Sequence, residues 1–476
     1  VPPVPPRPQG VERNVVISQW HWADGETYLH DQVSTDRRAP TVNAYGSIYG
    51  AAELSSELLP VLDPLRHTTS RVEITPRDAD TPQAAGASYM PSPNWGDEQI
   101  WTSRSDVHNA MFDGEGRLWM TTRIRPPANP DVCRAGSSHP SAKRYPIDSA
   151  VRQAAVYDPK TQQTTYIDTC FDTHHLMFGE DADDTLWFNG YGSAYLGWLN
   201  TKMFDATGDA MASQGWTALI LDTTGNGMRD AYTEVGEPVD ATKDTRIADA
   251  LYSVNPASDG SVWGSVLGFP GAIVRVVPGS DPTETALAER YELPWLDESL
   301  PIEGYSPRGM DIDRNGVAWV ALGSGHMARF DREACEVTNG PTATGQHCPE
   351  GWTFYTQPLP QFKDVQAAGS GEGSYFAWVD QFDTFGLGAN TPIATGNQSD
   401  AFLALKDEEW VVLRVPYPMG FYTKWLDGRI DDPDAGWKGR GLWSTVGSRT
   451  PFHMETGKGT PPIAMHFQLR PDPLAK

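Results

Sequence analysis

One short motif recurs along the whole chain: an aspartate, a turn that contains glycine, an apolar residue and then an aromatic residue. The clearest copies are DGEGRLW, DADDTLW, SDGSVW and DRNGVAW, which end at Trp119, Trp187, Trp263 and Trp319, with weaker copies ending at Tyr49 and Trp443. Such self-similarity is typical of repeat architectures. Aspartate and glycine supply the turn between two strands, and the aromatic residue is expected to lie between neighbouring sheets.

Each copy separates two apolar strands, and two more strands follow it, as in residues 154–169. Residues 402–418 show the same pair of strands for a further unit. Seven such units predict an all-β fold, a seven-bladed β-propeller, in which only short sheet edges are exposed. The alternative is an irregular β-sandwich. The last unit lacks an outer strand, so we expect Asn14–Trp22 to supply it and to close the ring. The predicted domains are a Pro-rich segment, 1–13, and a single propeller, 14–476.

Composition fits this fold and excludes several partners. The 45 glycines and 39 prolines suit many short strands joined by tight turns. The formal charge of −25 disfavours binding to nucleic acid or to anionic lipid, because both are negatively charged. No stretch approaches the roughly 20 apolar residues that a membrane span needs.

The four cysteines form two local pairs, Cys133 with Cys170 and Cys335 with Cys348, without the C-x-x-C spacing of zinc clusters. They predict two disulfides and an oxidising compartment. A Pro-rich start without methionine is typical of a mature exported chain and equally of a trimmed one. We therefore expect a periplasmic or secreted protein.

Blade geometry predicts which side chains meet at one end of the channel. Counting back 11 residues from the motif's aromatic residue reaches the start of each innermost strand. This count selects Arg38, His108, His174 or His175, Tyr252 and Arg308. Connections and segments at the same end add His30, His326 and His453.

Converging neutral imidazoles are suited to Zn, Fe or Cu. The predicted metal ligands are His30, His108, His174 or His175, and His326, with His453 a weaker candidate. Arg308 and Tyr252 are the predicted catalytic residues, because a fixed cation stabilises an oxyanion and a phenol can move a proton. A single histidine at a strand end is more often structural, so the prediction depends on their convergence. His67 and His139 are expected to be structural or exposed.

Two further segments carry predictions. In Leu221–Tyr232, Asp222, Asn226 and Asp230 resemble the oxygen ligands of a calcium loop; the alternative is an Asn-Gly turn. The insert at 124–150 is expected to cover the histidines as a lid held by the Cys133–Cys170 disulfide, or simply to be stapled there.

The units His108–Arg123 and Pro307–Asp331 resemble blades of streptogramin B lyases and of the wider gluconolactonase-like propellers. Streptogramin B lyases open a cyclic ester by metal-assisted elimination, so the resemblance implies a propeller with a catalytic histidine at its top. Peptidyl-hydroxyglycine lyases are similar in plan, and in that comparison His108, His174 or His175, Arg308 and Tyr252 would hold and assist a zinc. A four-histidine iron centre would instead resemble carotenoid-cleaving oxygenases, whose motifs are absent here.

Three functions follow as expectations. The first is a metal-dependent enzyme that acts on a small organic substrate by lyase or ring-opening chemistry. The second is an iron or copper oxidoreductase with four histidines, and the third is a non-catalytic propeller that binds a ligand or a protein.

Overall fold

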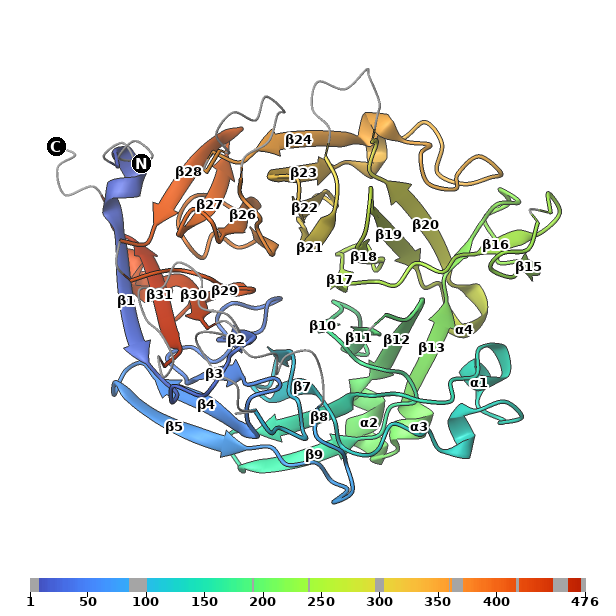
Figure 1. Cartoon of the computed structure of the whole chain (residues 1–476), viewed down its shortest axis with the longest axis horizontal. Helices are drawn as coiled ribbons and strands as arrows, with labels where there is room; N and C mark the ends of the chain where they lie inside the picture. Colours follow the sequence, from blue (N-terminus) through green and yellow to red (C-terminus); the bar gives the residue numbers. More distant parts are fainter. Residues whose placement is uncertain are drawn as a thin grey trace.

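The strands form mainly antiparallel sheets arranged radially around a common axis (Figure 1). The computed structural model describes residues 8–84, 101–190, 192–238, 240–295, 304–358, 360–361, 371–416, 419–447 and 461–471. Within these residues there are six four-stranded sheets and one seven-stranded sheet. This arrangement confirms the predicted all-β propeller.

The first three sheets follow one another along the chain, each with its strands in sequence order from the axis outward. Sheet 1 contains β2 (Asp31–Val33), β3 (Ile48–Ala51), β4 (Leu58–Asp63) and β5 (Thr68–Glu73). Sheet 2 contains β6 (Ala110–Phe112), β7 (Leu118–Thr122), β8 (Gln153–Asp158) and β9 (Gln163–Ile167). Sheet 3 contains β10 (Leu176–Phe178), β11 (Thr185–Asn189), β12 (Tyr195–Asn200) and β13 (Gln214–Ala218).

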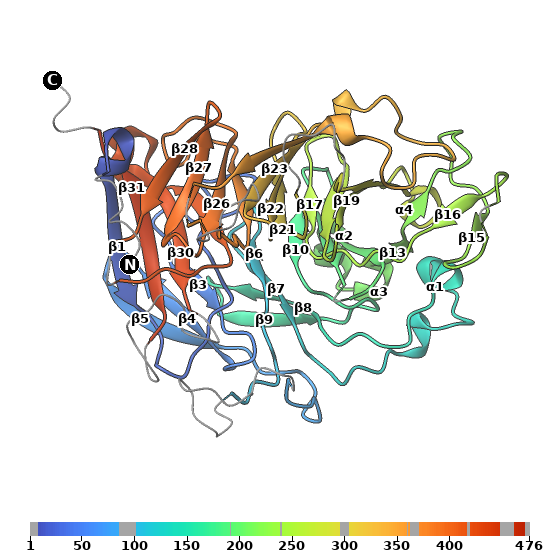
Figure 2. The ribbon, with the colours of Figure 1, turned by 45° about the horizontal axis from the view of Figure 1, so that its top comes forward.

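Sheet 4 is the seven-stranded sheet. Its antiparallel inner part consists of β17 (Asn255–Pro256), β18 (Val262–Val266), β19 (Ala272–Val277) and β20 (Leu287–Glu292). Three short strands extend it outward: β14 (Ile220–Leu221), β16 (Asp244–Arg246) and β15 (Tyr232–Thr233). The extension lies at the outer edge of the ring (Figure 2).

The remaining sheets complete the chain. Sheet 5 contains β21 (Pro307–Ile312), β22 (Ala318–Leu322), β23 (His326–Phe330) and β24 (Trp352–Thr356). Sheet 6 contains β25 (Ala377–Asp380), β26 (Thr391–Gly396), β27 (Ala401–Lys406) and β28 (Glu409–Arg414). Sheet 7 contains β29 (Leu426–Ile430), β30 (Arg440–Val446), β31 (Ile463–Leu469) and, outermost, β1 (Val15–His21).

The helices are short and lie in the connections. The α-helices are α1 (Pro140–Arg144), α2 (Thr201–Thr207), α3 (Ala210–Ser213) and α4 (Pro282–Thr285). The 3₁₀ helices are η1 (Gly10–Asn14), η3 (Asp131–Cys133), η4 (Arg332–Ala334), η5 (Pro349–Gly351) and η6 (Pro433–Gly439). Within the described residues, no helix combines the length and apolar character that crossing a membrane requires.

Strand β1 joins the two ends of the described chain. It pairs antiparallel with β31 from Val15 opposite Leu469 to His21 opposite Ile463. This pairing covers the edge of β31, which would otherwise be exposed and unpaired.

The recurring motif forms a turn that is tied to its own aromatic residue. Oδ1 of Asp113 accepts the backbone N–H groups of Glu115 and Arg117, each at 2.9 Å, and Oδ2 accepts the indole N–H of Trp119 at 2.8 Å. The Trp119 ring is buried, and its centroid lies 5.9 Å from that of Phe178 in sheet 3. The aspartate thus fixes the turn, while the tryptophan fills the space between sheets.

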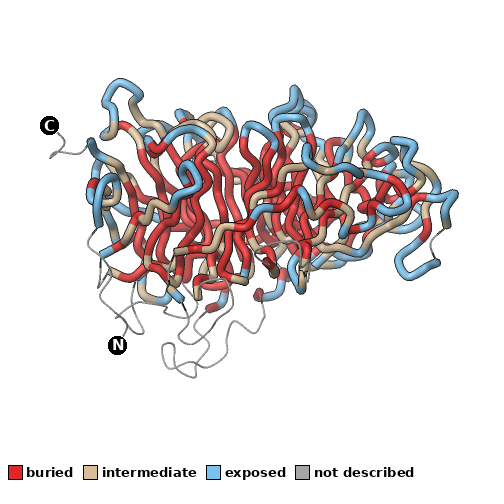
Figure 3. The backbone as a smooth tube through the Cα atoms, turned by 90° about the horizontal axis from the view of Figure 1, so that it is seen from above, coloured by how far each residue is buried: buried red, intermediate tan, exposed pale blue. Residues whose placement is uncertain are grey.

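The innermost strands contact one another around the axis: β2 contacts β6 and β29, and β10 contacts β6 and β17. The backbones of β21 and β25 approach closely at Gly309, whose N–H donates to the carbonyl of Tyr375 at 3.0 Å. A Cβ at Gly309 would lie 2.0 Å from a ring atom of Phe376, so glycine is required there. Buried residues fill the middle of the sheets, while exposed residues gather in the loops (Figure 3).

Both predicted disulfides are present, Cys133–Cys170 and Cys335–Cys348, with Cα–Cα distances of 5.3 and 5.2 Å. They close loops of 37 and 13 residues in sequence separation and favour an oxidising compartment.

Candidate metal centre

Each innermost strand begins with a side chain able to take part in chemistry. These residues are His30 before β2, His108 before β6, His174 and His175 before β10, Tyr252 before β17, Arg308 in β21, Tyr375 before β25 and Lys424 before β29. Their backbones are held by the neighbouring strand: the N–H of His30 donates to Ala51, and that of His108 donates to Thr121. Sequentially distant groups therefore meet at one end of the axis.

Three imidazoles form a compact group. One nitrogen of each of His30, His108 and His175 lies within 4.8 Å of the corresponding nitrogens of the other two. Their ring centroids are 4.0 Å apart for His30 and His108, and 5.2 Å apart for His108 and His175. This spacing allows three nitrogens to share one metal ion.

The partners of the Nδ1 atoms orient these rings. Nδ1 of His175 lies 2.8 Å from the carbonyl oxygen of Tyr252; because a carbonyl only accepts, this nitrogen carries the proton and Nε2 keeps its lone pair. Nδ1 of His108 lies 3.0 Å from Oε1 of Glu53, and its buried Nε2 has no hydrogen-bond partner in the described residues. Nδ1 of His30 lies 2.8 Å from Oδ1 of Asp31. Carboxylate or carbonyl partners of this kind accompany metal-bound histidines.

Burial keeps the imidazoles neutral. It lowers the pKa of His175 to about 4, with the nearby His30 acting in the same direction, and it lowers the pKa of His108 well below its usual value. Burial also raises the pKa of Asp31 to about 7, against the effects of His175 and a hydrogen bond from Asn109. Neutral imidazole is the form that binds metal.

The structure places His174 beside this group. Its ring centroid lies 3.9 Å from that of His175 and 4.5 Å from that of His108. Nδ1 of His174 is 3.4 Å from the side-chain nitrogen of Asn189. Of the two residues that the sequence left open, His175 belongs to the compact group, and His174 covers one side of it.

His326 lies elsewhere. It begins β23, the third strand of sheet 5, where its Nδ1 lies 3.0 Å from Oγ of Ser324 and its ring lies 6.5 Å from that of Phe354. Among the described residues, His326 is not part of the group of side chains close enough to share one metal ion. His453 lies outside the described residues.

Tyr252 and Tyr375 form a hydroxyl pair next to the imidazoles. The Tyr252 hydroxyl donates to that of Tyr375. Burial raises the pKa of Tyr252 to about 12, against the opposing effects of Tyr375 and Arg308. The guanidinium carbon of Arg308 lies 5.2 Å from the Tyr375 ring centre, and Nζ of Lys424 lies 5.1 Å from it. Two cations therefore flank a pair of neutral phenols.

Two cavities meet at these residues. A cavity of about 1190 Å³ is lined by Glu53, His108, Arg308 and other residues of the same end of the axis. A second, of about 30 Å³, is lined by Asp31, Asn109, His175, Lys424 and their neighbours. His30, Tyr252 and Tyr375 line both cavities, so they separate the wide space from the narrow one.

One position of the residue count is wrong. Arg38 lies at the other end of the sheets, where its guanidinium contacts the carbonyl of Gly179 at 2.8 Å and the carboxylate of Asp184 at 3.0 Å. The long connection between β2 and β3, residues 34–47, displaces the count, and His30 takes the inner position instead.

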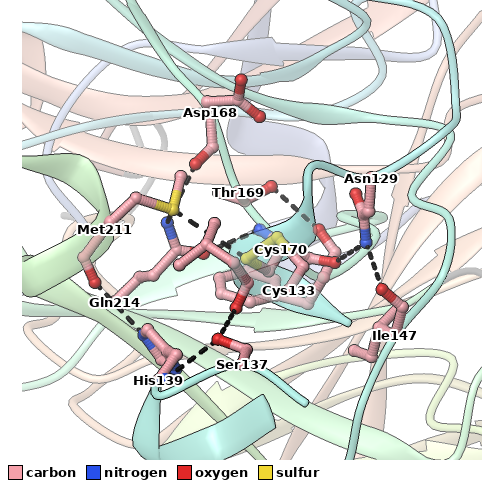
Figure 4. Close-up of a disulfide and its surroundings, with 12 residues drawn as sticks. Asn129, Cys133, Ser137, His139, Ile147, Asp168, Thr169, Cys170, Met211 and Gln214 are labelled. Atoms are coloured by element: carbon pink, nitrogen blue, oxygen red, sulfur yellow. Dashed lines mark hydrogen bonds between the residues drawn. A yellow bond between two sulfur atoms is a disulfide. The ribbon is translucent and has the colours of Figure 1, made fainter. Parts of the chain in front are cut away.

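The 124–150 insert is not a lid over the histidines. Its helix α1 contacts β13 and α4 at the outer edge of the ring, and the ring of His139 stacks 4.8 Å from that of Trp216. Figure 4 shows the Cys133–Cys170 disulfide with Asn129, whose side-chain nitrogen donates to the carbonyls of Ile147 and Cys170. Of the insert, only Pro127 lines the wide cavity, together with Val151, which directly follows the insert.

The predicted calcium loop is held by hydrogen bonds within the chain. Oδ1 of Asp222 accepts the N–H of Gly225 at 2.7 Å, and its Oδ2 accepts the N–H of Gly227 at 2.8 Å. Asp230 accepts a hydrogen bond from Asn226 at 2.8 Å. The calcium interpretation of these residues stays a prediction.

No protein-family model matches the chain, and no curated protein matches it in sequence. Among solved structures, a streptogramin B lyase is similar to 96% of this chain over 100% of its own length, with a TM-score of 0.49 and 9% identity. A catalytically inactive virginiamycin B lyase from Staphylococcus aureus, solved with quinupristin, covers 95% of this chain and 99% of its own, at 0.48 and 9%. The structure of the WD40 repeats of RRP9 covers 96% of this chain and 98% of its own length, with a TM-score of 0.47 and 10% identity. The resemblance to streptogramin B lyases thus extends over nearly the whole chain, and it concerns the fold.

Proposed function

We propose that this protein is a metal-dependent enzyme that acts on a small organic substrate by lyase or ring-opening chemistry. The observation that carries the proposal is the group of His30, His108 and His175, whose nitrogens lie within 4.8 Å of one another. Each ring comes from a different sheet, and an oxygen lies within 3.0 Å of each Nδ1.

The donor set fits Zn, Fe or Cu. Three neutral nitrogens with oriented Nδ1 partners leave at least one coordination position for water or substrate, as in catalytic zinc sites. The unsatisfied, buried Nε2 of His108 is a donor atom that costs free energy unless something binds it. A metal bound there would polarise an oxygen of the substrate.

The surrounding residues supply the remaining chemistry. Arg308 reaches the wide cavity and would stabilise negative charge that develops on a substrate oxygen. Tyr252 is a neutral phenol with a pKa of about 12, so it can donate a proton and recover it through Tyr375. Burial lowers the pKa of His174, so its ring is uncharged beside the proposed centre.

A second function is a four-histidine iron or copper oxidoreductase. The position of His174 favours it, because the His174 ring lies within 4.5 Å of those of both His108 and His175. A third, non-catalytic function is binding of a ligand or protein in the wide cavity.

Architecture and location complete the proposal. We count sheet 4's β17–β20 as the fourth blade of seven, with β1 closing the ring on β31, and we take residues 14–476 as one propeller. The two disulfides support a periplasmic or secreted location.

Metal analysis of protein purified without a histidine tag tests the function. Zinc or manganese at about one ion per chain supports the lyase, and iron or copper supports the oxidoreductase. Absence of a bound transition metal supports the non-catalytic binding function. His108→Ala and His175→Ala should each remove most of the metal, while the matched control His326→Ala should retain it. Full metal content in both ligand variants would overturn the proposed centre. Loss in His174→Ala as well would favour four ligands.

A further inference from the structure

Three aromatic rings from separate segments cluster near the wide cavity. The centroid of Phe269 lies 4.7 Å from that of Trp295 and 5.3 Å from that of Tyr305, and the Trp295 and Tyr305 centroids are 5.1 Å apart. Phe269 lies between β18 and β19, Trp295 follows β20, and Tyr305 precedes β21. We call these residues the aromatic cluster.

The cluster is joined to the cavity of the candidate metal centre. Leu267, two residues before Phe269, lines the cavity, as does Arg308, three residues after Tyr305. A backbone hydrogen bond from Ser306 to Pro270, 2.8 Å long, ties the two segments together. The cluster therefore lies at the rim of the wide cavity, on the side that carries Arg308.

The aromatic cluster is partly open to solvent: Phe269 is exposed, while Trp295 and Tyr305 are half-buried. Phe269 is 63% exposed, the largest value among the large apolar side chains that the structure describes, and Leu267 is 45% exposed. Exposed apolar side chains gathered at the rim of a cavity are typical of ligand sites. Rings held edge to face leave flat faces and edges on which another ring can pack.

Arg308 adds a charge requirement to the same sector. Its guanidinium lies over Tyr375, and within the described part of the chain it makes no ion pair with a carboxylate. Arg152, another arginine of this cavity, already forms an ion pair with Asp106, at 2.7 Å. An anionic group of a ligand would therefore find its cation at Arg308.

We propose that the aromatic cluster is a substrate subsite, and that the substrate is an organic anion bearing a planar aromatic ring. The ring packs on Phe269 and Trp295, and the anionic group lies at Arg308. This inference rests on the proposed function only in taking the ligand to be the substrate of the metal centre.

Calorimetric titration of the full chain with three probes tests the subsite. The probes are 2-naphthylacetate, which has ring and charge, 2-naphthylethanol, which has the ring alone, and acetate, which has the charge alone. Wild-type protein should bind naphthylacetate at least about tenfold more tightly than either of the others. Equal affinity for acetate and naphthylacetate would overturn the proposal.

Variants assign the two contacts. Phe269→Ala and Trp295→Ala should each weaken naphthylacetate about tenfold, and Phe269→Leu, which keeps an apolar side chain, should weaken it by a similar factor. Arg308→Met should weaken naphthylacetate but not naphthylethanol. The control Leu65→Ala removes another exposed apolar side chain, 60% exposed in the turn between β4 and β5, and should change nothing. Unchanged naphthylacetate affinity in both ring variants would overturn the subsite.

The same titration separates this proposal from the metal centre. If His108→Ala protein loses metal but Phe269→Ala still weakens naphthylacetate, both proposals are supported. If wild-type protein holds no transition metal while the ring variants lose affinity, the metal centre fails and the subsite stands.

Discussion

Nδ1 of His108 lies 3.0 Å from Oε1 of Glu53, which reaches it from the connection between β3 and β4 of the neighbouring sheet. The contact depends on the backbone, since the N–H of Glu53 donates to the carbonyl of Val107 at 2.7 Å. A carboxylate beside Nδ1 fixes the ring with Nε2 directed away from Glu53. It also makes Nε2 a stronger electron-pair donor to a metal ion.

Glu53→Gln should therefore lower metal affinity about 10- to 100-fold without unfolding the protein, because the amide can keep a hydrogen bond but not the charge. Competition with a chromophoric chelator measures the change. Glu57→Gln, in the same connection and close to Arg104 rather than to a histidine, is the control. Equal affinities for Glu53→Gln and wild type would contradict the role of this contact.

His326 should make stability depend on pH. Burial lowers its pKa from 6.5 to about 4 in the folded protein, so the unfolded chain binds the proton first as pH falls. The free energy of unfolding should drop by up to about 3 kcal/mol between pH 7 and pH 4 from this residue alone. Urea unfolding of wild type and His326→Gln across this range checks it.

The difference between the two proteins should shrink as pH falls, since the variant lacks the titrating ring. Phe354→Leu, which alters the packing beside His326 without removing the imidazole, should lower stability by the same amount at every pH. Parallel curves for wild type and His326→Gln would show that the ring does not titrate in this way.

The Asp-to-Trp turn should matter for stability. Asp113→Ala leaves the buried indole N–H of Trp119 without its partner and removes two turn hydrogen bonds, so we expect a loss of about 2 kcal/mol. Thermal unfolding measures the loss. Glu115→Ala, an exposed position of the same turn, should stay within about 0.5 kcal/mol of wild type; a similar loss in both variants would mean that the turn's hydrogen bonds contribute little.

The two disulfides should contribute unequally. The Cys133–Cys170 loop spans 37 residues and the Cys335–Cys348 loop spans 13, so removing the first should cost about 1 kcal/mol more through chain entropy. Paired Cys→Ser replacements compared by chemical unfolding test the order. A larger loss for the shorter loop would contradict the entropic account.

The fold was predictable because each repeat is encoded by a short, continuous stretch of sequence. Each Asp-to-Trp motif makes its own turn and supplies its own packing residue, so a pattern of seven residues identifies a strand pair. Sheets 6 and 7 depart from it: the connection from β25 to β26 spans residues 381–390, and that from β29 to β30 spans 431–439. Tyr375 was missed because no copy of the motif in sheet 6 marked where to begin the count. Lys424 was missed because the weak copy that ends at Trp443 follows the long connection in sheet 7.

The candidate site was predictable only in part. The spacing selected His108, Tyr252 and Arg308 because their sheets have short first connections. It failed at Arg38. The connection from the second to the third strand suggested His326, which begins the third strand of its sheet and lies apart from the compact group. Glu53 carries no sequence signal at all, because its partner is set by the contact between two sheets.

The pairing of β1 with β31 has a consequence for biosynthesis. Val15 leaves the ribosome 454 residues before its partner Leu469, so during that whole interval the first strand exposes an edge with nothing to receive it. Until β31 emerges, the nascent chain is vulnerable to pairing with other extended segments.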